Sequence, residues 1–208
     1  MECTAELRGE HEMLRHVLEA LGRTVEALGS GGRPDERLLV GFSDFAQGFV
    51  YRCHQLKEDH LFRILEDAGL SRERAPLAAL LGDHEDGLDH VIAMFKALPG
   101  ATGGDPAATA CLAENIVAYL DLQGAHMEAE EFVFEFSESV LSDADNCSAV
   151  ALFRGVEKDL GEDVIRRYHA LAERIARGPD TPATDTDSPA GAASVAPQGH
   201  ATEVVSPD

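Results

Sequence analysis

The 208-residue sequence has no tryptophan and only three tyrosines beside its nine phenylalanines. No alternating apolar and polar run is flanked by Asn-Gly or Asp-Gly, so the usual signature of a β-hairpin is missing. No apolar run approaches the roughly 20 residues of a membrane-spanning helix, and the polar N-terminus predicts no signal peptide. These absences argue against a β-sheet protein and against an integral membrane protein.

Basic residues are scarce as well. Lys and Arg number 17 against 38 Asp and Glu, which gives a formal net charge of -21. Nucleic acids and anionic membrane surfaces bind a basic face, so neither is expected as a partner. The four cysteines are dispersed without a C-x-x-C motif, which argues against a zinc ribbon and suits free thiols in a reducing cytoplasm.

The chain divides into a helical body and a tail. Residues 179–208 are rich in Pro, Ala, Thr and Asp and contain no Lys, Arg, Leu, Ile or Phe, a composition typical of disorder. Before them, Gly-, Pro- and Ser-containing breaks separate helical segments at 5–28, 35–67, 74–98, 106–140 and 148–177. We therefore expect an all-α protein with an up-down-up-down four-helix bundle at 1–140, an additional C-terminal helix packed on the bundle at 148–178, and a disordered acidic tail at 179–208.

Polar residues interrupt the apolar stripes of all four bundle helices. The six positions are His11, His54, Glu58, His84, His126 and Glu130. Four of them form two pairs with the same His-x-x-x-Glu spacing. Because unpaired imidazoles and carboxylates are costly to bury, their presence on four core faces predicts a shared metal.

Depth along the bundle supports one site. If the helices alternate in direction and rise ~1.5 Å per residue, all six side chains lie at one level, within the usual error in helix ends. Residues at i and i+4 share a helix face, so each histidine can bind one metal while the glutamate reaches a second. Imidazole and carboxylate ligands suit iron, and also manganese or zinc. The alternative is a metal-free structural bundle whose polar layer is a hydrogen-bond network.

Other polar residues near the stripes are expected to stay out of this site. Four histidines should lie on the surface or in packing positions, namely His16, His60, His90 and His169. Six acids beside the candidate ligands should face away, namely Glu10, Glu12, Asp59, Asp83, Glu85 and Glu131. Gln123 and Tyr119, one and two turns from His126, could hydrogen-bond a bound ligand.

Four stretches together resemble the hemerythrin-like family, the HHE cation-binding domain. They are Glu10-His11-Glu12-Met13, residues 53–59 with Leu61-Phe62, residues 83–87, and residues 126–131 with Val133-Phe134. The resemblance covers about residues 5–140. The segment from Phe153 to Leu171 is similar to a C-terminal extension in many bacterial members.

This resemblance implies a bundle that holds two iron ions (Fe2+/Fe3+), bridged by oxo or hydroxo. It implies four terminal ligands and two bridges, which are His11, His54, His84 and His126, and Glu58 and Glu130 respectively. The third helix of the family often carries His-x-x-x-His, and its second position here is Leu88. One imidazole fewer than in an oxygen carrier leaves more open coordination, which favours chemistry with small oxidants.

The expected function is therefore that of a non-haem di-iron protein which binds or senses O2, peroxide or NO, with an unknown protein partner. A di-iron oxidoreductase that consumes peroxide or O2, an iron-sulfur repair protein and a metal-free bundle are the alternatives. The sequence leaves open whether the protein is an enzyme.

Overall fold

The computed structural model describes residues 1–178, and every regular element within that range is a helix. In chain order the helices are α1 (Glu2–Gly29), α2 (Glu36–Phe45), η1 (Ala46–His54), α3 (Gln55–Asp67), α4 (Leu77–Thr102), α5 (Pro106–Val140), α6 (Asp143–Leu160) and α7 (Glu162–Arg177). The predicted all-helical class is confirmed, whereas the predicted tail at 179–208 lies outside the described residues. None of the described helices combines the length and the apolar character needed to cross a membrane.

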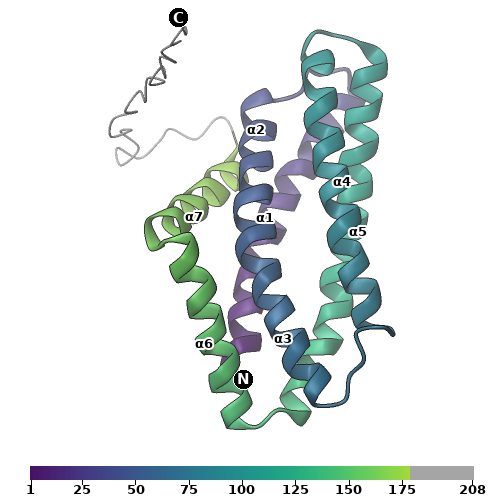
Figure 1. Cartoon of the computed structure of the whole chain (residues 1–208). Helices are drawn as coiled ribbons and strands as arrows, with labels where there is room; N and C mark the ends of the chain where they lie inside the picture. Colours follow the sequence, from purple (N-terminus) through teal and green to yellow (C-terminus); the bar gives the residue numbers. More distant parts are fainter. Residues whose placement is uncertain (179–208) are drawn as a thin grey trace, which may run out of the picture.

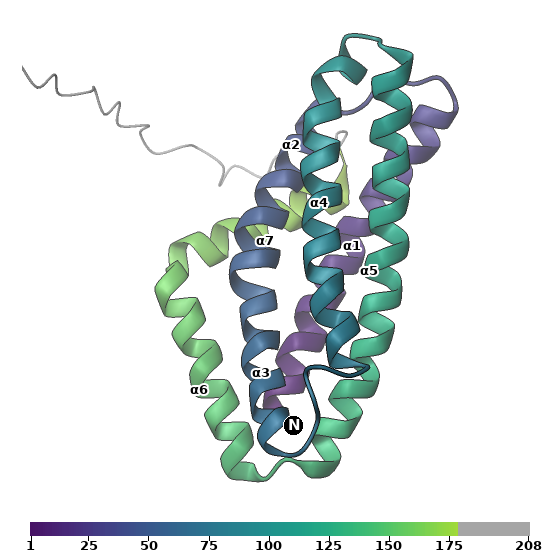
Figure 2. The ribbon, with the colours of Figure 1, turned by 45° about the vertical axis from the view of Figure 1, so that its right-hand side comes forward.

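Four long rods lie side by side: α1, the continuous run α2–η1–α3, α4 and α5 (Figures 1 and 2). The rod α5 packs against both α1 and α4. The two remaining helices cover one flank, with α6 along α3 and α7 against α1 and α2. The bundle thus has one flank that carries a second layer of helix.

Two expected helix boundaries are wrong near the C-terminus. The break predicted between the segments 106–140 and 148–177 is helical from Asp143, because Ser142 and Asp145 form a reciprocal capping box that starts α6. The helix predicted at 148–177 is divided at Gly161, whose φ of 98° suits glycine and ends α6. The capping box thus lengthens the first half, and the glycine turns the second half back toward the bundle.

The middle of the second rod is a π-helix, η1, which ends at His54. A π-turn holds more residues than an α-turn and occurs frequently at functional sites. It accounts for the broad apolar stripe of this segment, on which Phe45, Phe49 and Val50 are all buried. Gly48 lies under the phenol ring of Tyr168 from α7, which leaves no room for a Cβ.

The inward face of α4 differs from a regular stripe that runs through His84 and Leu88. Such a stripe would bury Phe95, which is 52% exposed, while Met94 is buried. Gly87 is likewise buried and Leu88 only half-buried. The buried positions still alternate by three and four residues along the helix, but in the opposite order to that stripe. The inward face is therefore turned around the helix axis.

The apolar core consists of two separate clusters. One contains Leu14, Phe49 and Ile116 among others. The second contains Leu7 and Phe62 with further residues of α4, α5 and α6. On each of the four rods, the predicted polar residues stand between the portions that belong to the two clusters.

Candidate metal centre

The structure brings all six candidate ligands together. They come from every rod, with His11 on α1, His54 at the end of η1, Glu58 on α3, His84 on α4, and His126 and Glu130 on α5. Their ligand atoms form two groups, within each of which the atoms lie within 4.8 Å of one another. The first group is His11, His54, Glu58 and Glu130, and the second is Glu58, His84 and His126. Glu58 belongs to both groups, as a bridging carboxylate would.

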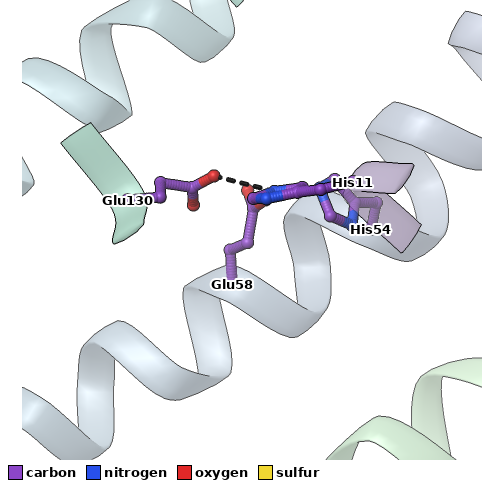
Figure 3. Close-up of side chains that lie close together, drawn as sticks. All are labelled: His11, His54, Glu58 and Glu130. Atoms are coloured by element: carbon purple, nitrogen blue, oxygen red, sulfur yellow. Dashed lines mark ion pairs between the residues drawn. The ribbon is translucent and has the colours of Figure 1, made fainter. Parts of the chain in front are cut away.

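The imidazoles of the first group turn Nε2 toward the carboxylates. His54 Nε2 is 2.7 Å from Glu58 Oε1, and His11 Nε2 is 3.0 Å from Glu130 Oε2. Figure 3 shows these four side chains and marks the ion pair between His11 and Glu130. His11 Nε2 is also 3.8 Å from Glu58 Oε1.

The second group repeats this geometry. His84 Nε2 lies 3.0 Å from Glu58 Oε2, and His126 Nε2 lies 3.4 Å from Glu130 Oε2. All four Nε2 atoms therefore face the same two carboxylates, from four directions.

Several of these facing atoms are buried without a hydrogen bond. They are His11 Nε2, His84 Nε2 and both carboxylate oxygens of Glu58 and of Glu130. A buried polar atom left unsatisfied costs about 1–3 kcal/mol, and more if it is charged. A metal ion would satisfy imidazole nitrogens and carboxylate oxygens together, and this donor set suits iron, manganese or zinc. The residues present thus fit a pair of such ions.

The two carboxylates differ in their electrostatics. Burial opposes the charge of Glu58, but the surrounding imidazoles, His54 foremost, outweigh it and hold the pKa of Glu58 well below its ordinary value. Burial and repulsion from Glu58 raise the pKa of Glu130. Glu58 is therefore the stronger anion of the pair, which matches its place in both groups.

The imidazoles show the converse effect. Burial disfavours their protonated form, but the carboxylates they face outweigh burial and raise the pKa of His11, His54 and His84. A metal ion at this position would compete with protons for the same ring nitrogens.

Two acids that were expected to face away contact the candidate ligands instead. Glu10 Oε2 lies 2.7 Å from His54 Nδ1, and Asp83 Oδ2 lies 3.2 Å from His126 Nδ1. Such a carboxylate holds the proton on Nδ1, so that Nε2 is free to bind a metal. Glu131, another of the six acids expected to face away from the site, does so: it turns outward and its carboxylate lies 2.6 Å from the guanidinium of Arg8.

A buried lysine was missed altogether. Lys57 is fully buried, and its Nζ donates to Glu6, Glu10 and Glu157 at 2.6–2.8 Å. Burial disfavours the ammonium, but the carboxylates outweigh it and raise the pKa of Lys57. The three acids lie close enough to resemble a cation site, and the ammonium already satisfies them.

The remaining predicted positions lie away from the carboxylates. His16 and His169 are exposed, and His60 and His90 are half-buried. The ring of His169 packs edge-on against Phe49, in agreement with a packing role. Tyr119 and Gln123 are both buried, and their side chains lie next to Gly87 of α4. A Cβ added at Gly87 would be 3.4 Å from the amide nitrogen of Gln123.

Comparison with known proteins gives one match. Residues 4–135 match the family described as the hemerythrin HHE cation binding domain. The matched range runs from α1 through most of α5 and includes all six candidate ligands. No curated protein and no solved structure matches the chain.

Proposed function

Because the chain belongs to the hemerythrin HHE cation-binding family, we propose that it is a non-haem di-iron protein which binds or senses O2 or a related small oxidant, peroxide or NO. The observation that carries the proposal is the convergence of four imidazoles on two buried carboxylates that lack hydrogen bonds. Bound iron supplies redox electrons and open coordination positions for such a ligand.

The chain's own residues would hold the ions and keep water away. We assign His11 and His54 to one ion and His84 and His126 to the other, with Glu58 as the first bridge. Glu130 is assigned as the second bridge, since its Oε2 lies 3.0 Å from His11 Nε2 in one group and 3.4 Å from His126 Nε2 in the other. The apolar clusters on either side of the polar layer exclude bulk water, which strengthens electrostatic contacts within it.

A metal-free structural bundle is the weaker alternative. In a hydrogen-bond network built for stability, the buried atoms would pair in hydrogen-bond geometry. Here the oxygens of Glu58 and of Glu130 lie 2.7–3.4 Å from imidazole nitrogens without forming a hydrogen bond.

A di-iron oxidoreductase that consumes O2 or peroxide is the second candidate, with an iron-sulfur repair protein as a variant of it. The position one turn beyond His84 is the half-buried Leu88, which brings no further imidazole to the layer. Fewer protein ligands leave more coordination positions for substrate.

The wider assignment follows the same proposal. We take residues 1–140 as an up-down-up-down bundle and the helices α6 and α7 as its extension, which the rods lying side by side in Figures 1 and 2 support. The four cysteines are free thiols, which supports a reducing compartment such as the cytoplasm.

The decisive experiment is metal analysis of the purified protein with an optical spectrum before and after O2. We expect about two irons per chain and a spectrum that changes on exposure to O2. His54→Ala should abolish that spectrum, whereas His60→Ala, on the same rod but away from the carboxylates, should preserve it. Well under one metal per chain in the wild type would overturn the proposal.

A second variant tests the open coordination. Leu88→His would bring an additional imidazole close to His84 on α4. We expect slower reaction with peroxide and a longer-lived spectral change with O2, measured by stopped-flow absorbance. Unchanged kinetics would place position 88 out of reach of the metals.

A further inference from the structure

Lys57 is a fully buried ammonium where α1, α3 and α6 meet. Its Nζ donates to Glu6 Oε1 at 2.7 Å and Glu10 Oε1 at 2.6 Å, both on α1. It also donates to Glu157 Oε1 at 2.8 Å, on α6. An ammonium gives three hydrogen bonds, so this set of acceptors satisfies the buried cation in full.

Glu10 uses its two oxygens for different partners. Oε1 accepts from Lys57, while Oε2 lies 2.7 Å from His54 Nδ1. A carboxylate held at both oxygens cannot rotate without losing one contact. Lys57 therefore fixes Glu10, and Glu10 in turn fixes the ring orientation of His54.

The far end of this series of contacts lies beyond the family match. Glu157 is on α6, whereas the match ends at residue 135. Phe153, one turn earlier on α6, is fully buried, and its ring centroid is 5.9 Å from Lys57 Nζ. On α7, Tyr168 closes over Gly48 in η1, the segment that leads into His54. The α6–α7 pair is thus built onto the same flank of the bundle that supports His54.

Resting on the di-iron site proposed above, we propose that Lys57 and Glu157 are positioning residues that hold Glu10 against His54, and that through them the α6–α7 pair sets the affinity of the metal position next to His54. The other metal position, next to His84 and His126, takes its outer carboxylate from Asp83 on α4. The effect of the α6–α7 pair should therefore fall on one of the two metals.

Solvent reaches this series of contacts. A groove of about 730 Å³ between α1 and the α6–α7 pair is lined by Glu6, Glu10 and Glu157 among other residues. Water can replace part of a lost contact at its edge. We therefore expect removal of one charge from Glu157 to weaken one metal about tenfold, the lower end of the range for partners outside the ligand shell.

The test is an anaerobic calorimetric titration of the full-length, metal-free protein with ferrous iron. The wild type should bind two ions, and Glu157→Gln should weaken one of them while the other keeps its affinity. Glu173→Gln is the matched control, because Glu173 lines the same groove on α7 and pairs with Arg177 rather than with Lys57. It should leave both affinities unchanged.

A double variant separates positioning from general destabilisation. Glu10→Gln already removes the carboxylate whose two oxygens join Lys57 to His54, so adding Glu157→Gln should cause no further loss of iron affinity. Unchanged affinities in Glu157→Gln, equal weakening of both ions, or an additive loss in the double variant would each overturn the inference. A wild type that binds no iron would instead refute the proposed function itself.

Discussion

The two His-x-x-x-Glu pairs have the same spacing but different support. On one side, His54 Nδ1 is 2.7 Å from Glu10, which is nearly buried and is itself held by Lys57. On the other side, His126 Nδ1 is 3.2 Å from Asp83, whose side chain is 33% exposed. The difference arises because α6 and α7 cover only the flank on which His54 lies. Identical ligand spacing therefore does not give identical ligand environments.

The largest effect should come from the residue common to both sides. Glu58→Ala removes the one carboxylate that lies in both groups, so we expect both irons to be lost. The loss of affinity should exceed the roughly 100-fold upper end for a partner outside the ligand shell. Metal content after desalting measures it. Asp59→Ala is the control, because Asp59 turns away toward Arg72, and a similar loss of iron there would contradict the assignment.

A smaller effect should appear in the free energy of unfolding, which we expect to fall more for a charge removed on the buried flank than for one removed on the exposed flank. Lys57→Met leaves three carboxylates facing one another without their cation, so the metal-free protein should lose about 3–5 kcal/mol of unfolding free energy. Arg8→Met removes two ion pairs, to Glu131 and Glu138, whose partners are partly exposed, and should cost at most about 1 kcal/mol. Urea unfolding of the two metal-free variants measures the difference. Equal losses would show that Lys57 behaves as an ordinary surface charge.

The smallest effect should rank the two outer carboxylates. Within the 10–100-fold range for such partners, Glu10→Gln should lie near the upper end and Asp83→Asn near the lower end. The physical reason is that the contact of Glu10 is shorter and less exposed than that of Asp83. Chelator competition for bound iron gives both values. A larger loss for Asp83→Asn would reverse the comparison.

Much of the candidate site could be predicted from the sequence, because its six candidate ligands lie on the main apolar stripes. The repeated His-x-x-x-Glu spacing and the common depth follow from helix geometry alone. Glu10 escaped prediction because it lies about 100° around α1 from His11, on a face that is buried only in the presence of the C-terminal helices. A signal did exist, since Cys3, Glu10 and Val17 are buried seven residues apart.

Other features of the structure depend on contacts between helices, which the apolar pattern of a single helix does not reveal. Lys57 lies on the buried face of the second rod between Cys53 and Leu61, but a lysine there is credible only once acids from α1 and α6 are known to meet it. The π-helix before His54 lies against α7, where Gly48 meets Tyr168. The division at Gly161 has a local cause, the positive φ that glycine permits. The inward face of α4 could not be predicted from the sequence either, because the helix carries apolar residues at two alternative sets of positions.

The separation of the core into two apolar clusters has a consequence for how the protein unfolds. The clusters are joined by the helix backbones and by a layer of charged and polar side chains. Without a metal, the two ends of the bundle therefore share little of the apolar contact that makes unfolding cooperative. Ions bound in the layer would tie four rods together at its centre. Bound iron would then connect the two apolar clusters. Its removal should let one end of the bundle exchange its amide hydrogens independently of the other end.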